Sequence, residues 1–311
     1  MRQRVKVLAA LAFFAAIGAM PAAAVQRAFV ASYGSDANVA TNCGFTRPCR
    51  SFNSALPVVD PGGELLALDA AGYGPVVITK SVTITANPGV YAGIAASSGN
   101  AVTITGTGID VILRYLSINS LGADKGIAMT AGASLTVENC VISAFNLNGV
   151  FVSAPALVRI LDSKVIGGVD GLYVQGGAAL DVTRSTFRGS QQAGVHVNGS
   201  IAGPTTNGTV IDSVSTGNAV GFLAFADTAG GNARLAVTRS AASNNTYGVW
   251  VYNTNGGTAR ATVSGSIVTN NNEGLRNGVT PNAGTLESQG NNTVSQNVLN
   301  TNGTITPLAG I

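Results

Sequence analysis

The sequence predicts an all-β fold, a single parallel β-helix, on three observations. A four-residue phrase, glycine followed by an apolar, a variable and an apolar residue, recurs along most of the chain. Its copies are 22 to 27 residues apart, and a near-constant period of this length is typical of a solenoid. Between the copies lie short alternating strand patterns, with none of the periodicity of a helix. The phrase begins at Gly126, Gly149, Gly171, Gly194, Gly221, Gly248 and, more weakly, Gly274.

Residues 1–24 have the order of a secretory signal peptide. Arg2, Arg4 and Lys6 precede an apolar run at 7–19, and small residues at 22–24 provide a cleavage site. Because the run is shorter than the about 20 apolar residues that cross a bilayer, we expect cleavage and no membrane span in the mature chain. The sequence therefore predicts an exported protein, either periplasmic or extracellular.

The formal charge of +3 depends on this leader. Without its three cations the 17 basic side chains fall to the same number as the 14 acidic ones. Only 10% of the residues are charged, and a nearly neutral mature chain gives no electrostatic reason to bind nucleic acid. We expect a monomer without a nucleic-acid partner.

The domain boundaries follow from the cysteines and from the limits of the repeat. Export permits disulfides, and we expect Cys43 and Cys49, which enclose a short loop, to be bonded. Residues 25–62 are assigned to an N-terminal cap that this loop fixes, with Ser51 as the N-cap of a short helical turn. Residues 63–290 are assigned to the β-helix. Residues 291–311 lose the period and are expected to form a C-terminal cap or a tail.

The variable residue of the phrase is expected on the outer surface. Its two apolar neighbours point into the coil, so the residue between them points outward. Coils stacked at about 4.8 Å bring these residues into one column. Phe225 and Tyr252 follow two residues later on their own strands. The column consists of Ala128, Phe151, Tyr173, His196, Leu223, Trp250 and Arg276.

This aromatic column predicts a binding surface. Aromatic faces pack against the C–H faces of sugars, and an exposed aromatic stripe usually marks a contact surface. We therefore predict a non-catalytic carbohydrate-binding, surface-binding or structural protein, whose partner would be a polysaccharide or a cell-surface glycan. Alternatively, a loop covers the column, or the rings stack only on one another. The ligand-binding candidates are Phe151, Tyr173, His196, Trp250, Tyr252 and Arg276.

The alternative function is a polysaccharide lyase that acts by β-elimination on a uronic-acid polymer. It would use Tyr173 and His196 on adjacent coils with Arg188 or Lys164 nearby, and only in this case would Ca²⁺ be expected. A hydrolase is less expected, because it needs clustered carboxylates. We assign no catalytic residue, no metal ligand and no cofactor, and favour a protein that is not an enzyme.

The acidic residues alternate with cations at the spacing of the coils instead of forming a cluster. Asp162, Arg184, Asp212 and Arg239 occupy equivalent positions in successive repeats. Such a column predicts a surface charge ladder, in which each exposed pair contributes about 0–1 kcal/mol.

Several phrases resemble those of a known group. They are residues 29–38, 48–52, 78–84 and 135–142, together with the run 290–292 near the end. With them the chain resembles the right-handed parallel β-helix proteins of the pectin-lyase-like superfamily, and more narrowly an exported bacterial group without an assigned activity. The resemblance covers nearly the whole mature chain. It implies a right-handed coil but no particular reaction.

Overall fold

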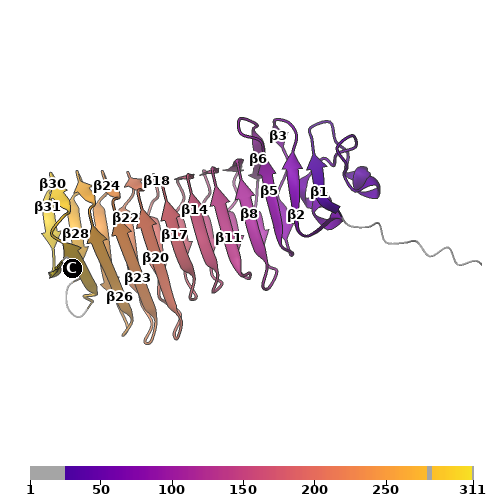
Figure 1. Cartoon of the computed structure of the whole chain (residues 1–311). Coiled ribbons are helices and arrows are strands. Elements are labelled where there is room, and N and C mark those ends of the chain that lie inside the picture. Colours follow the sequence, from indigo (N-terminus) through magenta and orange to yellow (C-terminus); the bar gives the residue numbers. More distant parts are fainter. Residues whose placement is uncertain (1–24, 279–281, 310–311) are drawn as a thin grey trace, which may run out of the picture.

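The computed structural model describes residues 25–278 and 282–309. In this part the chain winds into an elongated parallel β-helix, and its coils succeed one another from β1 to the C-terminal strands (Figure 1). The predicted fold class is confirmed. The predicted signal peptide falls on residues 1–24 and lies outside the described residues.

Three parallel sheets form the walls of the coil in the described part. Sheet A has twelve strands: β1 (Val25–Val30), β2 (Val59–Ala67), β5 (Val82–Ala86), β8 (Asp110–Arg114), β11 (Ser134–Glu138), β14 (Leu157–Leu161), β17 (Ala179–Thr183), β20 (Thr205–Ile211), β23 (Asn232–Thr238), β26 (Thr258–Ser264), β29 (Thr285–Gln289) and β32 (Ile305–Leu308). Sheet B has ten: β3 (Ala71–Gly72), β6 (Ala92–Ala96), β9 (Leu116–Ser120), β12 (Val141–Ser143), β15 (Lys164–Ile166), β18 (Thr186–Arg188), β21 (Val214–Thr216), β24 (Ala241–Ser243), β27 (Ile267–Thr269) and β30 (Thr293–Ser295). Sheet C has ten: β4 (Val76–Ile78), β7 (Asn100–Ile104), β10 (Lys125–Met129), β13 (Asn148–Val152), β16 (Asp170–Val174), β19 (Ala193–Asn198), β22 (Val220–Ala226), β25 (Tyr247–Asn253), β28 (Glu273–Asn277) and β31 (Leu299–Asn302).

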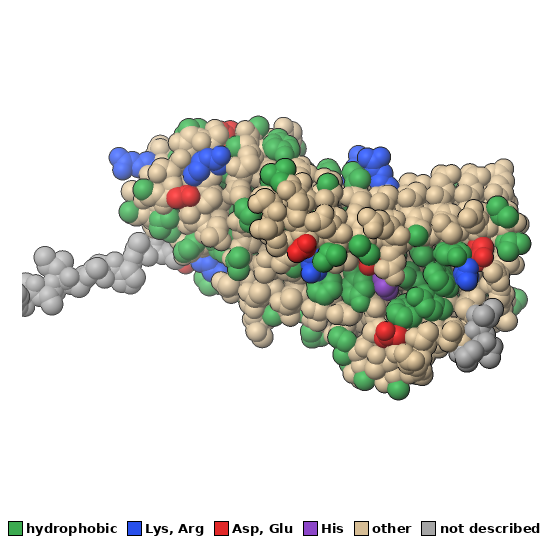
Figure 2. Space-filling view, turned by 180° about the vertical axis from the view of Figure 1, so that it is seen from behind, with side chains coloured by type: hydrophobic (Ala, Val, Ile, Leu, Met, Phe, Trp, Pro, Cys, Tyr) green, Lys and Arg blue, Asp and Glu red, His purple; other side chains and the backbone are tan. Residues whose placement is uncertain are grey.

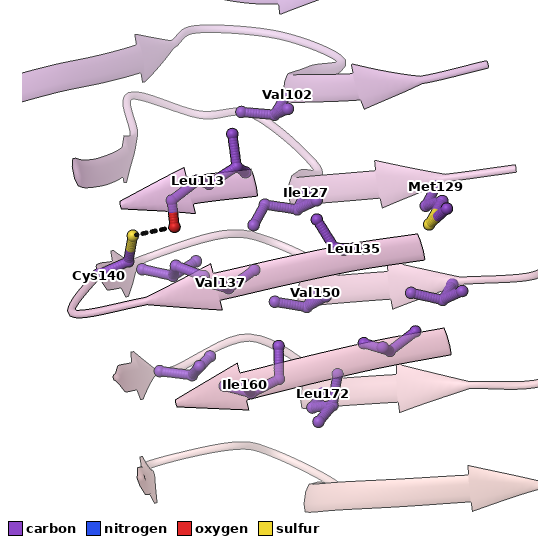
Figure 3. Packing of buried hydrophobic residues seen from close by; sticks show 14 of the residues in the cluster. Val102, Leu113, Ile127, Met129, Leu135, Val137, Cys140, Val150, Ile160 and Leu172 are labelled. Atoms are coloured by element: carbon purple, nitrogen blue, oxygen red, sulfur yellow. Dashed lines mark hydrogen bonds between the residues drawn. The ribbon is translucent and has the colours of Figure 1, made fainter. Parts of the chain in front are cut away.

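The core consists of apolar columns that run along the coil. No strand is long enough to bury its own apolar face, so each buries it against the strands of the same and neighbouring coils. Figure 3 shows residues of sheet C facing residues of sheet A across the interior. One such column pairs Val102, Ile127, Val150 and Leu172 in register, and all four are fully buried.

The glycine of the repeated phrase allows successive coils to approach closely. A Cβ added at Gly171 would lie 2.7 Å from the carbonyl oxygen of Gly194. At Gly221 it would lie 2.5 Å from the carbonyl oxygen of Gly248. Real Cβ atoms essentially never come within 3.0 Å of another heavy atom in this way, so the stacking itself requires glycine here.

The predicted charge ladder is present at the corner between sheets A and B. Arg184 forms an ion pair with Asp162 of the preceding coil at 2.7 Å, and Arg239 forms one with Asp212 at 2.8 Å. The hydrogen bond from Arg184 holds the pKa of Asp162 below its ordinary value. Since these side chains are substantially exposed, the ladder belongs to the surface and contributes little to stability.

The N-terminal segment covers the outer edge of β1. Cys43 and Cys49 form the predicted disulfide, and both are fully buried. Backbone hydrogen bonds join Phe29 to Cys43 and Cys49, and Ala31 to Cys49, along β1. Two short 3₁₀ helices, η1 (Asp36–Thr41) and η2 (Leu56–Val58), and one helical turn, α1 (Phe52–Ala55), complete the segment. Ser51 is the N-cap of α1 and accepts a hydrogen bond from the backbone of Ser54, as predicted.

The C-terminal segment differs from the expected cap or tail. Residues 293–308 form β30, β31 and β32, which pair with β27, β28 and β29 and continue all three sheets. The amide of Asn271 donates to Asn297 at 2.9 Å, and the backbone of Ser266 donates to Asn292 at 2.8 Å. Hydrogen bonds to stacked asparagine side chains therefore continue the coil after the last glycine phrase.

Candidate functional site

The outer face of sheet C carries the predicted column. The strand register places Phe151 beside Tyr173, Tyr173 beside His196, and Trp250 beside Arg276. Figure 2 shows hydrophobic side chains gathered around the single histidine of the described part. These side chains are separate from the core inside the coil. They form a second cluster of Ala193, Val220, Leu223, Phe225, Tyr247, Trp250 and Tyr252.

The rings form a continuous series across the strands from β13 to β25. Phe151 stacks on Tyr173, and Trp250 stacks on Tyr252. The imidazole of His196 joins the two groups through an edge contact with Tyr173 and a tilted contact with Phe225. The centroid distances are 5.5 Å for Phe151–Tyr173, 4.7 Å for Tyr173–His196, 6.3 Å for His196–Phe225, 4.4 Å for Phe225–Tyr252, 4.4 Å for Trp250–Tyr252 and 4.7 Å for Tyr247–Trp250.

Burial differs along the column. Phe151, Tyr173, Trp250 and Tyr252 are half-buried, so each ring has an accessible part as well as ring neighbours. His196 is different, because it is only 3% exposed. It points away from the core, yet its neighbours on the outer face cover it. The expectation of an outward aromatic face therefore holds for the rings, whereas the imidazole lies beneath the surface.

Cations lie at both ends of the row of rings. The Nζ atom of Lys125 lies 5.1 Å from the ring centre of Phe151. The guanidinium of Arg276 lies 4.4 Å from the ring centre of Tyr247 and 4.8 Å from that of Trp250. Arg276 also pairs with Glu273 at 3.1 Å. Distances of this size are favourable for cation–π interactions, so the rings help to orient both cations.

A carboxylate that the repeat pattern does not predict lies beside His196. The Oδ1 atom of Asp170 is 3.4 Å from Nδ1 of His196 and accepts a hydrogen bond from the backbone of Ala193 at 3.0 Å. Neither imidazole nitrogen has a well-aligned hydrogen bond within the described residues. Asp170 directly precedes Gly171 of the repeated phrase, but the equivalent position before Gly126 is Lys125, so the repeat does not mark this place as acidic.

Tyr173 is held in its protonated form. Its hydroxyl donates to Oε1 of Gln175 at 3.1 Å. Burial, followed by the negative charges of Asp170 and Asp227, raises the pKa of Tyr173 to about 12. Because this pKa is far above 7, the hydroxyl stays protonated at neutral pH and acts as a hydrogen-bond donor. A general base would need a pKa near the working pH.

The structure does not bring the alternative catalytic residues together. Tyr173 and His196 are adjacent on sheet C, but Arg188 is exposed on β18 of sheet B. Arg188 instead lines a shallow hollow of about 480 Å³ with Ile166 and Thr216. Lys164 is likewise on sheet B, in β15. In the part of the chain that the structure describes, no three His, Cys, Asp or Glu side chains are grouped so as to hold a metal ion.

The chain belongs to a known family. It matches the family described as "Right handed beta helix region" over residues 66–209 and 125–306, and it belongs to that family. Its structure is similar to one titled "Crystal structure of pectate lyase Pel9A", with a TM-score of 0.62 and 15% identity over 92% of this chain and 78% of that one. A structure titled "Rhamnogalacturonan lyase" has a TM-score of 0.45 and 12% identity over 90% of this chain and 84% of that one. No curated protein matches the sequence.

These comparisons establish the fold but not the function, which has to be argued from the residues of the site. At 15% identity the likeness to the pectate lyase concerns the path of the chain. The right-handed coil that the resemblance implied is confirmed. Within residues 25–278 and 282–309, no helix combines the length and apolar character needed to cross a bilayer.

Proposed function

We propose that this protein is exported and binds a polysaccharide or a cell-surface glycan along the outer face of sheet C. The observation that carries the proposal is the continuous row of half-buried rings from Phe151 to Trp250 and Tyr252. Rings on a sheet surface that contribute nothing to the core of the coil are suited to pack against sugar faces. The Cys43–Cys49 disulfide supports export, because disulfides persist in oxidising compartments.

The arrangement favours a ligand that lies parallel to the axis of the coil. Phe151 and Trp250 are on β13 and β25, which are four strand spacings apart, so the row extends for about 19 Å at 4.8 Å per strand. Lys125 at one end would attract an acidic group on such a chain, whereas Glu273 balances the charge of Arg276 at the other end. The ligand proposed is therefore an extended glycan, and a polymer that carries carboxylates fits best.

The lyase remains the second candidate, and one contact favours it. Tyr173 and His196 are 4.7 Å apart between ring centres, with the carboxylate of Asp170 next to the imidazole. Two properties of the site favour binding over elimination. The nitrogens of His196 are buried, and the raised pKa of Tyr173 makes its hydroxyl a poor base at neutral pH.

The binding proposal is tested with Trp250, the single tryptophan of the chain. Its fluorescence should change in a saturable way when the protein is titrated with polygalacturonate, alginate or a neutral glycan such as xylan. Calorimetry should then show binding abolished or strongly weakened by Trp250→Ala, and unaffected by Tyr91→Ala, which removes an exposed ring near sheet B. If calorimetry with the wild-type protein detects no binding to any member of a broad panel of glycans, the binding proposal fails.

A separate measurement decides the lyase candidate. Elimination from a uronic-acid polymer yields a product with a C=C bond conjugated to the carboxylate, which absorbs in the ultraviolet. Absorbance that rises with wild type and stays flat with His196→Ala and Tyr173→Phe would establish elimination at this site. A flat trace with wild type on pectate, alginate and glycosaminoglycans, together with glycan binding, would leave binding as the function.

A further inference from the structure

We propose a second binding site on sheet A, an oxyanion site built around the guanidinium groups of Arg234 and Arg260. The two residues are register partners on β23 and β26, strands that lie side by side on the face shown in Figure 1. Register partners on one face of a parallel sheet are about 4.8 Å apart at the backbone. Both side chains are exposed, so two cations emerge next to each other on a surface with few charges.

The two arginines differ in how their charge is balanced. Arg260 forms an ion pair with Glu287, through a bond from its Nη2 atom and a 3.1 Å bond from Nε. The side chain of Arg234 has no ion pair or hydrogen bond to any other described residue, and its register partner on the opposite side is the neutral Asn207. Like charges side by side on a sheet repel each other. One positive charge of this pair therefore remains without compensation.

A hollow adjoins the pair. Its volume is about 400 Å³, and its lining includes Arg234, Arg260, Thr209, Ala236 and Thr262. Ala236 lies in the outward column between Thr209 and Thr262, and its short side chain leaves the space open. A smaller hollow of about 110 Å³ adjoins the same two arginines and is lined by Asn232 and Thr258 as well. The guanidinium groups thus border open space instead of lying flat against protein.

Hydrogen-bond donors remain free at this place, whereas the carboxylate of the lining is already engaged. Nε and Nη2 of Arg260 are bound to Glu287, and Nη1 has no partner among the described residues. The carboxylate of Glu287 also accepts a bond from Thr262 at 3.0 Å. Glu287 is the single acidic side chain in the lining, and both its oxygens are engaged. The whole fork of Arg234 and the free nitrogen of Arg260 are left to donate.

This chemistry selects a carboxylate or sulfate group. Arginine forks match such oxyanions with two parallel hydrogen bonds, which makes arginine suited to recognise them. The ligand class is an oxyanion, a carboxylate or a sulfate group, whatever molecule carries it. The site is on a different sheet from the aromatic row, so it stands or falls independently of the proposed function.

The test is an amide NMR titration of the full mature chain. The probes are sodium sulfate and sodium glucuronate, each compared with sodium chloride at the same ionic strength. We expect saturable shifts at the amides of Ala236 and Thr262 with at least one probe and none with chloride. Sulfate alone would assign a tetrahedral oxyanion to the site, and glucuronate alone would assign a carboxylate.

Two variants and one control complete the test. Arg234→Gln should weaken binding at least tenfold, and Glu287→Gln should tighten it several-fold by freeing Arg260. Arg188→Gln removes the same charge from sheet B and should leave the affinity unchanged. Equal shifts with chloride, or equal weakening by Arg234→Gln and Arg188→Gln, would show general charge screening and overturn the proposal.

Discussion

Asp170 and His196 form a buried polar pair on the outer face of a β-helix, with 3.4 Å between Oδ1 and Nδ1 and each side chain only 4% exposed. Outward residues of such a coil normally meet water, and here they lie beneath neighbouring aromatic rings. The carboxylate also accepts the backbone N–H of Ala193, the first residue of β19. Asp170 therefore links two successive coils as well as adjoining the imidazole.

Removing this acceptor should destabilise the protein. In Asp170→Ala the buried N–H of Ala193 loses its partner, which costs about 1–3 kcal/mol. Asp170→Asn retains a carbonyl oxygen at the same place and should cost clearly less. Urea denaturation followed by circular dichroism measures both. Equal stability of wild type and Asp170→Ala would show that the bond to Ala193 contributes nothing.

The glycine of the repeated phrase provides a second prediction. In Gly171→Ala the new Cβ would lie 2.7 Å from the carbonyl oxygen of Gly194, so the coils would have to move apart. Overpacking of this kind costs about 1–3 kcal/mol. Gly290→Ala is the matched control, because a Cβ there meets nothing within 4 Å and the φ angle is not left-handed. Thermal melts of the two variants should separate clearly, and similar melting temperatures would refute the close-approach explanation.

The sequence predicted the parts of this fold that repeat. Column neighbours such as Phe151 and Tyr173 follow from a period of two along the strand and one coil per repeat. Arg234 and Arg260 are also one period apart, so their juxtaposition could have been found in the same way. The C-terminal coil was missed because amides such as Asn297 continue the stacking after the glycine phrase has ended.

The unrepeated features of the site could not be predicted. Asp170 occurs in one coil, and other coils have Lys125 or Tyr247 at the position before the glycine. The burial of His196 depends on the sizes of Leu223 and Phe225 in the next coil and on how their side chains turn. The repeat period predicts neither Asp170 nor the burial of His196. It specifies which side chains point away from the core, but not how those outward side chains pack on one another.

The Arg260–Glu287 pair makes stability depend on acid pH. The hydrogen bond from Arg260, helped by that from Thr262, holds the pKa of Glu287 below its ordinary value of 4.5 despite burial. A depressed carboxyl pKa contributes stability that is present above 4.5 and is lost as the pH falls through the lower value of the folded state. Arg260 is 52% exposed, so we expect at most about 1 kcal/mol. Urea midpoints at pH 7 and pH 3 should differ less in Glu287→Gln than in wild type, and equal differences would contradict the assignment.

The orientation of the ligand on the aromatic row can be tested from its two ends. Phe151 and Trp250 are about 19 Å apart along the axis, so only an extended chain parallel to that axis contacts both. For a long oligosaccharide, Phe151→Ala and Trp250→Ala should each weaken binding about tenfold, or about 1.4 kcal/mol. A disaccharide reaches one end alone, so its affinity should fall in one variant and remain unchanged in the other. Calorimetry with a length series measures this, with Tyr91→Ala as the control and circular dichroism to check folding. A ligand that crosses the coils transversely would show the same variant dependence at every length, because lengthening it would never bring the second ring into contact.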